Sequence, residues 1–362
     1  MMGQPCSSCQ ASFTGYCGVD FGSRSVALEA LHCKNGFTVT GPAAAMKENR
    51  LTGTGARNKP LSHGLIIRWS DVFEPESILI EDPFAVSESI LSTRSREAVV
   101  SGPGKVELYT YVSKACGATG FSTGIAKFKP GAHLPYHAHE FSEAVTILEG
   151  RARVLVEGRA YRLGQYDCAH VPSGVAHQVE NEDPEGELVC HWAFATSSPV
   201  RELVDRKFPI DDRGSGNPTP ADPETIVRYE NDAIYELSKD AFFLDLFARR
   251  FGAVGICGGH GRFLPGASLP CHIHDFDESI TIVKGTAICL VEGRQYPVSD
   301  CDTAFIPKGT PHRFLNQSGG EMAMIWVYAG SEPDRHIVDA KYCSGELAWP
   351  GAQVILEQKL KV

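Results

Sequence analysis

The feature that most constrains this chain of 362 residues is an internal duplication in a single register. Residues 131–181 align without a gap with residues 266–316, and 24 of the 51 aligned positions are identical. Every aligned position lies 135 residues from its counterpart. Because this period is far longer than that of a solenoid repeat, it indicates a duplicated domain. The chain length also fits two domains.

The segments within each copy are typical of short β-strands. Runs such as VTILEG, ARVLVEG and GIAKFKPG are rich in Val, Ile, Thr and Phe and are bounded by Gly, Pro and Asp. No long stretch of either copy repeats its apolar residues with the period of a helix. We therefore expect an all-β protein in which each copy forms a sandwich or barrel.

The composition between the repeats predicts the domain boundaries. Residues 208–225 are dense in Pro, Gly and Asp, which is typical of a linker or surface loop. Residues 62–105 contain apolar runs and are expected to add strands to the first barrel or to the domain interface. The predicted parts are an irregular N-terminal segment (1–60), a first domain (61–205), a linker (206–230), a second domain (231–345) and a C-terminal extension (346–362).

Three histidines and one glutamate recur at the same spacing in both copies. These are His137, His139, Glu143 and His177 in the first copy, and His272, His274, Glu278 and His312 in the second. Residues two apart on a strand share a face, so the first two histidines of each set point into one space. Imidazole and carboxylate ligands suit a divalent transition metal and leave about two positions of an octahedral ion open. We expect Fe(II) or Mn(II), with Ni, Cu and Zn as alternatives, and up to two ions per chain.

These residues lie within two longer motifs, G-x5-H-x-H-x3-E-x6-G and P-x-G-x2-H-x3-N, and both copies match both motifs. In this respect the chain resembles the cupin superfamily over residues 106–196 and 241–331. The resemblance implies two tandem jelly-roll β-barrels, a bicupin, with a metal at the centre of each barrel. It also implies that the eight histidines and glutamates are the metal ligands.

Other polar residues near the motifs are open to more than one interpretation. His170 and His191, aligned with Phe305 and Trp326, are either catalytic residues that act as hydrogen-bond partners of the ligands or as general bases, or ordinary partly buried histidines. Their presence makes the first copy the preferred catalytic site. Tyr136 and Cys271 precede the first ligand of each set, and alternation points them away from the metal. His133 and His260 are interpreted as surface or turn residues.

Three classes of function fit this ligand set. The first, which is the one we expect, is a non-haem dioxygenase that acts on a small chelating phenol, enol or diketone; the other two are alternatives. The second is an O2-independent decarboxylase, isomerase or lyase in which the metal is a Lewis acid. The third is a non-catalytic cupin that binds a small molecule. Oxalate decarboxylases are bicupins, but the arginine that they carry shortly before H-x-H is missing from HLPYHAH and SLPCHIH.

Charge, hydropathy and cysteine content limit the binding partners and the cellular location that we expect. The net charge is −10 without a basic block, which argues against nucleic acid or an anionic membrane surface. No apolar run approaches about 20 residues and no secretory signal is recognisable, so a cytoplasmic protein with reduced thiols is expected. Cys6 and Cys9 form a C-x-x-C pair that could be a zinc knuckle or part of a tail. The apolar face at Ile288 and Leu290 could be covered either in a homo-oligomer or by packing between the two domains of the chain.

Overall fold

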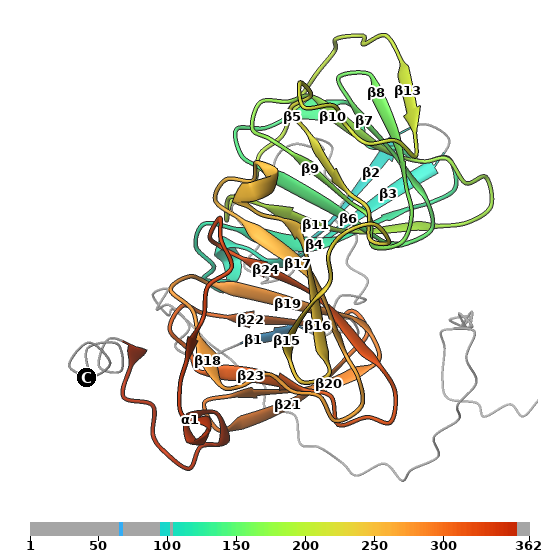
Figure 1. The fold of residues 1–362 in the computed structure, drawn as a ribbon. Coiled ribbons are helices and arrows are strands. Elements are labelled where there is room, and N and C mark those ends of the chain that lie inside the picture. Colours follow the sequence, from blue (N-terminus) through green and yellow to red (C-terminus); the bar gives the residue numbers. More distant parts are fainter. Residues whose placement is uncertain (1–64, 68–94, 102–103, 353–362) are drawn as a thin grey trace, which may run out of the picture. The chain divides into compact units, whose positions relative to one another are not determined.

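The structure, a computed structural model, describes residues 65–67, 95–101 and 104–352 (Figure 1). These residues form four sheets with very few helical turns, which confirms the predicted all-β class. The Cys6–Cys9 pair and the predicted N-terminal segment lie outside the described residues. No helix in the described part of the chain is long and apolar enough to span a membrane.

Two sheets form the first barrel. One has the strand order β14-β9-β6-β11-β4-β3-β2 and the other has the order β12-β5-β10-β7-β8-β13. The strands of the first sheet are β2 (Ser95–Ser101), β3 (Gly104–Val112), β4 (Ser122–Phe128), β6 (Glu143–Glu149), β9 (Cys168–Val171), β11 (Leu188–Phe194) and β14 (Thr225–Val227). Those of the second are β5 (His137–Ala138), β7 (Ala152–Val156), β8 (Arg159–Leu163), β10 (His177–Asn181), β12 (Glu202–Leu203) and β13 (Asp211–Gly214).

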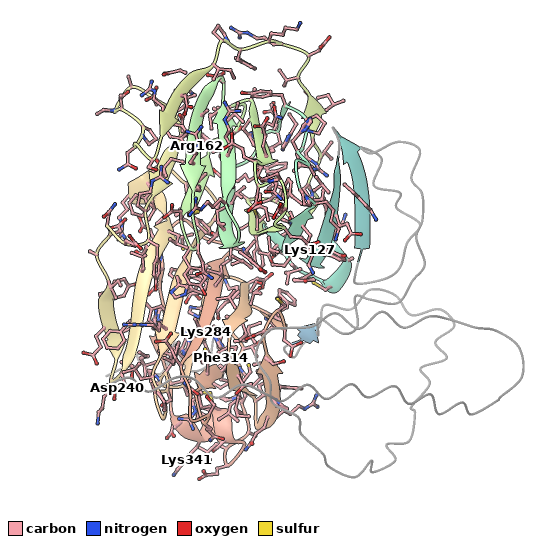
Figure 2. The ribbon with its side chains drawn as sticks, turned by 90° about the vertical axis from the view of Figure 1, so that its right-hand side faces the viewer. Lys127, Arg162, Asp240, Lys284, Phe314 and Lys341 are labelled. Carbon is pink, nitrogen blue, oxygen red and sulfur yellow. A yellow bond between two sulfur atoms is a disulfide. The ribbon has the colours of Figure 1, made fainter. Side chains whose placement is uncertain are left out.

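The second barrel repeats this arrangement with sheets of order β1-β22-β19-β24-β17-β16-β15 and β21-β20-β23-β18-β25. The first of these contains β1 (Leu65–Ile67), β15 (Tyr235–Ser238), β16 (Ala241–Phe247), β17 (Cys257–Phe263), β19 (Glu278–Lys284), β22 (Thr303–Ile306) and β24 (Met322–Tyr328). The second contains β18 (His272–Ile273), β20 (Thr286–Val291), β21 (Arg294–Ser299), β23 (His312–Leu315) and β25 (His336–Ile337). Phe314 of β23 is among the largest buried side chains of this barrel (Figure 2).

Segments outside the two repeats complete the sheets. Strand β1 pairs antiparallel with β22 of the second barrel, whereas β2 pairs with β3 of the first. The described strands within residues 62–105 therefore serve both barrels. Two strands come from the segment that the sequence suggested as a linker. Strand β13 pairs in parallel with β8, and β14 pairs antiparallel with β9, so this stretch lies along the first barrel.

Identical local sequences build identical turns in the two copies. The sequence LVEGR forms a two-residue hairpin loop between β7 and β8 and again between β20 and β21. Glu157 and Gly158 have φ of 47° and 93°, and Glu292 and Gly293 have φ of 45° and 79°. Two consecutive positive φ values suit the right-handed twist of a hairpin. The glycine in each pair adopts this conformation without a steric penalty.

The central strands of each barrel are buried on both faces. In β6, Val145 and Ile147 belong to the core of the first barrel, whereas Ala144 and Leu148 belong to an apolar cluster that also contains Ile325 of the second barrel. We call this shared group the inter-barrel cluster. Because both faces are covered, sequences such as LVCHWAF and MAMIWVY are continuous apolar runs rather than alternating ones.

Reciprocal hydrogen bonds also join the barrels. Asp277 Oδ2 accepts hydrogen bonds of 2.8 Å from the backbone N–H and from the hydroxyl of Thr119, and Asp277 Oδ1 accepts one of 2.8 Å from the N–H of Lys308. At the equivalent place in the other copy, Ser142 Oγ accepts from the N–H of Val254 at 3.2 Å. The acceptors Asp277 and Ser142 are 135 residues apart, as are the donors Thr119 and Val254, so the duplication is carried into the interface; Lys308 belongs to the same barrel as Asp277.

Asp277→Asn is expected to lower the free energy of unfolding by about 2 kcal/mol, because hydrogen bonds to charged groups contribute roughly 1.5–3 kcal/mol. Ser142→Ala is the matched variant from the other copy. It removes one neutral hydrogen bond, so a loss of about 1 kcal/mol is expected. Urea denaturation followed by tryptophan fluorescence measures both values. A loss in Asp277→Asn no larger than that in Ser142→Ala would contradict the assignment of Asp277 as the stronger contact.

A disulfide fastens the C-terminal segment to the second barrel. Cys271 is bonded to Cys343 of the short helix α1 (Ala340–Ser344), so the expectation of reduced thiols is wrong for this pair. The other described cysteines are free. Leu290 and Val338 pack with the disulfide in one small apolar cluster. Part of the outward apolar face that suggested an oligomer contact is therefore covered by residues of the same chain.

Candidate metal centres

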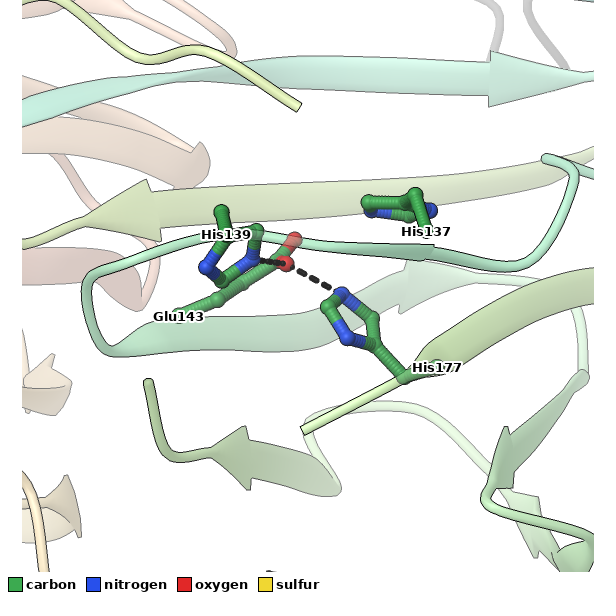
Figure 3. A group of neighbouring side chains, drawn as sticks. All are labelled: His137, His139, Glu143 and His177. Carbon is green, nitrogen blue, oxygen red and sulfur yellow. Dashed lines mark hydrogen bonds and ion pairs between the residues drawn. The ribbon is translucent and has the colours of Figure 1, made fainter. Parts of the chain in front are cut away.

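The four predicted ligands of the first copy lie together inside the first barrel (Figure 3). Their ligand atoms all lie within 4.8 Å of one another, and all four residues are buried. Glu143 Oε2 is 2.8 Å from Nε2 of His139 and 2.6 Å from Nε2 of His177. The predicted set of the second copy is gathered in the same way, with Glu278 Oε2 2.6 Å from Nε2 of His312.

Strand pairing brings these residues together from distant positions in the sequence. His177 lies directly opposite His137 in the pairing of β10 with β5, and His312 lies opposite His272 in the pairing of β23 with β18. Residues directly opposite in an antiparallel pair place their side chains on the same face. The glutamate is the first residue of the next strand along the chain, β6 or β19, and that strand belongs to the other sheet. Both sheets of each barrel therefore contribute to its site.

Backbone carbonyls fix the orientation of all six imidazoles. In the first barrel, Nδ1 of His137, His139 and His177 lies 2.9, 2.7 and 2.9 Å from the carbonyls of Pro135, Phe141 and Val175. In the second barrel, Nδ1 of His272, His274 and His312 lies 2.8, 2.5 and 2.9 Å from the carbonyls of Pro270, Asp334 and Thr310. A carbonyl only accepts, so the proton is assigned to Nδ1 and the lone pair of Nε2 points inward.

This arrangement fits a cation. With the proton on Nδ1, each site collects three imidazole lone pairs around a carboxylate, and no proton lies between them. In the second barrel, Nε2 of His274, Nε2 of His312 and Oε2 of Glu278 are buried without a hydrogen-bond partner among the described residues. Unpaired buried acceptors are costly, and a divalent ion would satisfy all of them together.

The protonation states are those of metal ligands. Burial lowers the pKa of His137 and of His272 well below the ordinary value, which keeps both imidazoles neutral. Burial alone would raise the pKa of Glu143, but the imidazoles of His177 and His139 beside it hold that pKa well below its usual range. Neutral imidazoles and an ionised carboxylate are the forms that bind a metal.

Aromatic side chains surround each ligand set. Phe194 lies opposite Glu143 in the pairing of β11 with β6, and its ring centroid is 5.6 Å from that of His139. Tyr328 takes this place in the second barrel, opposite Glu278, with its ring centroid 4.5 Å from that of His274. The second barrel therefore has a hydroxyl where the first has only a phenyl ring.

The structure corrects the alignment used for His191. Phe194 and Tyr328 are 134 residues apart rather than 135, because six residues lie between Asn181 and β11 but only five lie between the equivalent Asn316 and β24. The counterpart of Trp326 is therefore Trp192, and the counterpart of His191 is Ile325. His191 pairs with Ile125, and Ile325 pairs with His260.

His170 and His191 do not face the first ligand set. On β11, Cys190, Trp192 and Phe194 point into the barrel core, so His191 points to the opposite face, towards the inter-barrel cluster. On β9, Ala169 and Val171 point into the core, which places His170 on the outer face as well. The interpretation of these two residues as catalytic partners of the ligands is therefore wrong. The sequence could not reveal this, because both faces of these strands are buried.

Three other expectations have clear outcomes. Tyr136 points away from the ligands, as alternation predicted, and its hydroxyl accepts a hydrogen bond from Gly158 N–H at 3.1 Å. Cys271 also points away, into its disulfide. The interpretation of His260 as a surface residue is wrong, because it is buried against Tyr166 and Tyr229 with ring centroids 4.5 and 5.0 Å away.

The second barrel, not the first, has the more polar surroundings. Asp245 is buried on β16, accepts a hydrogen bond of 2.7 Å from the hydroxyl of Tyr235, and pairs with Arg250 at 2.8 Å. Its counterpart in the first barrel is Thr110, since both residues lie opposite the equivalent glycine of the next strand. Together with Tyr328, this overturns the preference for the first copy, which depended on His170 and His191.

The sequence analysis overlooked a second repeat. PVRELVD (199–205) and PDRHIVD (333–339) share Pro, Arg, Val and Asp at the same positions, 134 residues apart. Strand β12 lies within the first of these segments and β25 within the second, and both pair with the strand that carries the H-x-H histidines. The signal could have been found by allowing one deletion after the ungapped block. In this repeat, Arg201 and Arg335 occupy equivalent positions, each one residue before the strand that pairs with an H-x-H strand.

Comparison with known proteins agrees with this architecture. The sequence matches the Cupin domain family over residues 124–194 and 259–328. A curated relative, the polyketide synthase CurC of Streptomyces cyaneus, is 30% identical over 95 residues, which are 26% of this chain and 62% of that protein. The chain thus matches less than two thirds of that relative's length.

Solved structures of oxalate decarboxylases have a similar fold. The enzyme of Lactobacillus farciminis gives a TM-score of 0.54 at 15% identity, over 67% of this chain and 86% of that one. The Bacillus subtilis enzyme gives 0.54 at 15% identity, over 67% of this chain and 76% of that one. A further structure of the Bacillus subtilis enzyme, described with Mn(II) centres, gives 0.53 at 16% identity, over 67% and 77%. At these identities the likeness concerns the fold.

The duplicated motifs, the two barrels that they build and the family match over both repeats agree with one another. Residues 124–194 and 259–328 are two cupin domains in tandem, and this chain is a bicupin.

Proposed function

We propose that this bicupin is a metal-dependent enzyme that acts without O2 on a small substrate bearing a carboxylate, as a decarboxylase or related lyase. The observation that carries the proposal is the presence of two complete, buried sets of three histidines and one glutamate. The tandem barrels that hold them resemble those of bacterial oxalate decarboxylases, which favours this class over a dioxygenase.

The residues that would hold the metal are the two ligand sets already described. Mn(II) or Fe(II) suits their imidazole and carboxylate donors, and the Bacillus subtilis structure described with Mn(II) centres makes manganese the first ion to test. A bound divalent metal supplies Lewis acidity, which polarises a carbonyl or carboxylate oxygen of the substrate.

The chain's own residues then have two tasks, of which the first is to exclude water and orient the substrate. Glu278 and its three histidines are almost fully buried, and Tyr328, Phe276 and Trp326 pack around them. A charged substrate in such surroundings interacts more strongly with fixed charges than it does in water.

The second task is proton supply. Loss of CO2 leaves an electron pair on the neighbouring carbon, which must take a proton to form the product. Burial raises the pKa of Tyr328 well above its ordinary value, so its hydroxyl is protonated at neutral pH and can transfer that proton to a more basic carbanion. We assign Tyr328 as this proton donor, with the proton replaced from solvent afterwards. The first barrel has Phe194 at this place, so the second barrel is the proposed catalytic site.

The test is to measure CO2 release and O2 uptake together, on protein loaded with Mn(II) or Fe(II). The panel contains oxalate, malonate and oxaloacetate, with phenols, flavonols and β-diketones as dioxygenase substrates. We expect CO2 release from at least one carboxylate without matching O2 uptake. Tyr328→Phe should lower the turnover number by about 10²–10⁴-fold, the usual contribution of a general acid. Phe194→Tyr is the matched variant and should leave the rate close to wild type.

O2 uptake in proportion to the substrate consumed would contradict this proposal and support the dioxygenase alternative. One observation keeps that alternative in the panel. The Streptomyces cyaneus relative carries the name of a polyketide synthase, and enols and diketones belong to polyketide chemistry.

A further inference from the structure

We propose that the disulfide between Cys271 and Cys343 controls metal retention in the second barrel. Oxidised protein then holds the ion of this barrel more tightly than reduced protein does, while the ion of the first barrel is unaffected. The bond joins the residue before the ligand His272 to helix α1, 72 residues farther along the chain. The inference concerns retention of the metal, so it goes beyond the proposed reaction and holds for whatever reaction the site performs.

The segment that this bond fastens runs along the H-x-H strand of the second barrel. We call residues 333–352 the strap, which contains β25 and α1. In the pairing of β25 with β18, Ile337 lies opposite His272. The N–H of Val338 donates to the carbonyl of Cys271 at 3.0 Å. The strap therefore pairs both with a metal ligand and with the cysteine before it.

The strap also orients a second metal ligand. The carbonyl of Asp334 accepts a hydrogen bond from Nδ1 of His274 at 2.5 Å, which directs Nε2 of that imidazole towards the site. The equivalent ligand of the first barrel, His139, donates instead to the carbonyl of Phe141, two residues away. The other four ligand imidazoles also donate to a carbonyl two residues away. Of the six imidazoles, only that of His274 depends on a distant segment.

The strap has little stability of its own. Helix α1 has only five residues, whereas an isolated helix needs roughly 12–15. Strand β25 has two residues, lies at the edge of its sheet and leaves Ile337 46% exposed. The buried apolar contacts of the strap form a small cluster in which Leu290 and Val338 surround the disulfide itself. A covalent bond that closes a long loop strongly disfavours the open state, so the disulfide is the main fastener.

The first barrel closes the same place without a thiol. Tyr136 stands at the position equivalent to Cys271, and its hydroxyl accepts a hydrogen bond from the N–H of Gly158 at 3.1 Å. In the second barrel the equivalent N–H, that of Gly293, donates to the carbonyl of Cys343 at 3.0 Å. The disulfide thus takes the place of a side chain that mild reductants do not change. A response to such reductants is therefore confined to the second barrel.

Reduction of the bond is a thiol–disulfide exchange with a dithiol such as dithiothreitol. A thiolate of the reagent attacks one protein sulfur and the other protein sulfur leaves as a thiolate. The second thiol of the reagent then displaces the first protein sulfur. The reagent loses two electrons and two protons and closes into a cyclic disulfide, while Cys271 and Cys343 become thiols.

Metal binding and reduction oppose each other in this arrangement. Cys271 and Cys343 are 1% and 0% exposed, so the strap must open before a reagent reaches the bond. Opening removes the Asp334 carbonyl from His274 and so weakens the ligand set. Coupling between two equilibria is reciprocal, so a bound metal ion must in turn disfavour opening and reduction.

The test measures the affinity of full-length protein for Mn(II), by elemental analysis and the Mn(II) EPR spectrum after dialysis at fixed free Mn(II) concentrations. The samples are oxidised protein, protein reduced anaerobically with dithiothreitol and then freed of the reagent, and Cys343→Ser. Cys301→Ser, which changes a free cysteine of the same barrel, is the matched control. His137→Ala and His272→Ala, each measured oxidised and reduced, assign any loss to one barrel.

We expect oxidised protein and the control to bind two ions per chain with the same affinities. Reduced protein and Cys343→Ser should bind one of these ions about 10–100-fold less tightly, the usual effect of losing a hydrogen-bond partner of a metal ligand. Reduction should weaken the remaining site of His137→Ala by the same factor and leave that of His272→Ala unchanged. Dithiothreitol should have no further effect on Cys343→Ser, and Mn(II) should slow the reduction of the wild-type protein.

Unchanged affinity for both ions in reduced wild type and in Cys343→Ser would overturn the inference while leaving the proposed function in place. Weakening of both ions in these samples would also overturn it, since the bond would then support the fold as a whole rather than one site. Failure of the oxidised wild-type protein to bind any metal would reject the inference and the proposed function together.

Discussion

His272→Ala is expected to remove one of the two metal ions per chain and to reduce turnover to background. His137→Ala is expected to remove the other ion and to leave most of the turnover. Each histidine supplies one of four buried donors to its own site, so each loss affects a single ion. The activities differ because Tyr328, Asp245 and Tyr235 lie in the second barrel, while the first has Phe194 and Thr110 at the places of Tyr328 and Asp245.

Metal content by elemental analysis and turnover with the best carboxylate substrate measure these effects. His133→Gln, which changes a histidine outside both ligand sets, serves as the control. Retention of two ions in either alanine variant would reject the corresponding site. Equal loss of turnover in both would mean that the two barrels share the reaction, and greater loss in His137→Ala would return the catalytic role to the first barrel.

Acid is expected to destabilise this protein strongly, through three buried histidines that are not metal ligands. Burial lowers the pKa of His191 to about 3, that of His260 to about 3 and that of His170 to about 4. In the unfolded chain each has a pKa of about 6.5. Between these values the unfolded state binds more protons than the folded state, so stability falls as the pH is lowered below about 6.5. At pH 5, each of these histidines lowers the free energy of unfolding by about 2 kcal/mol. This is because pH 5 lies about 1.5 units below the unfolded-state pKa, and each unit corresponds to about 1.36 kcal/mol.

The duplication supplies the variants that test this effect. His191 has Ile325 as its counterpart and His260 has Ile125, so each barrel pairs one isoleucine with one histidine across adjacent strands. In His191→Ile and in His260→Ile, the loss of unfolding free energy between pH 7.5 and pH 5 should be about 2 kcal/mol smaller than in wild type. Protonation of the metal ligands is common to all these proteins and cancels from the difference.

The measurement is urea denaturation at the two pH values on protein with the same metal content. An unchanged pH dependence in both isoleucine variants would show that these histidines find a proton acceptor in the folded state. It would reject the assignment of His191 and His260 as neutral, buried groups.

The sequence by itself determined the fold class and the two groups of four residues that the structure gathers. Their spacing is set locally, because alternation within a strand fixes the direction of an H-x-H pair and short turns fix where the next ligand begins. The duplication repeated the pattern, so that each copy supported the interpretation of the other. The LVEGR hairpins are a second local pattern that folds in the same way twice.

Tertiary structure decided the rest, because it depends on contacts between residues far apart in the chain. Strands buried on both faces give no alternation, so only the packing of two barrels shows that His170 and His191 face the inter-barrel cluster. A loop shorter by one residue moved the counterpart of His191 from Trp326 to Ile325. Pairing placed β12 and β25 beside the H-x-H strands, and the disulfide joins Cys271 to a residue 72 positions away. Spacing along one strand is a property of the sequence, whereas the register between strands is fixed only when the barrel closes.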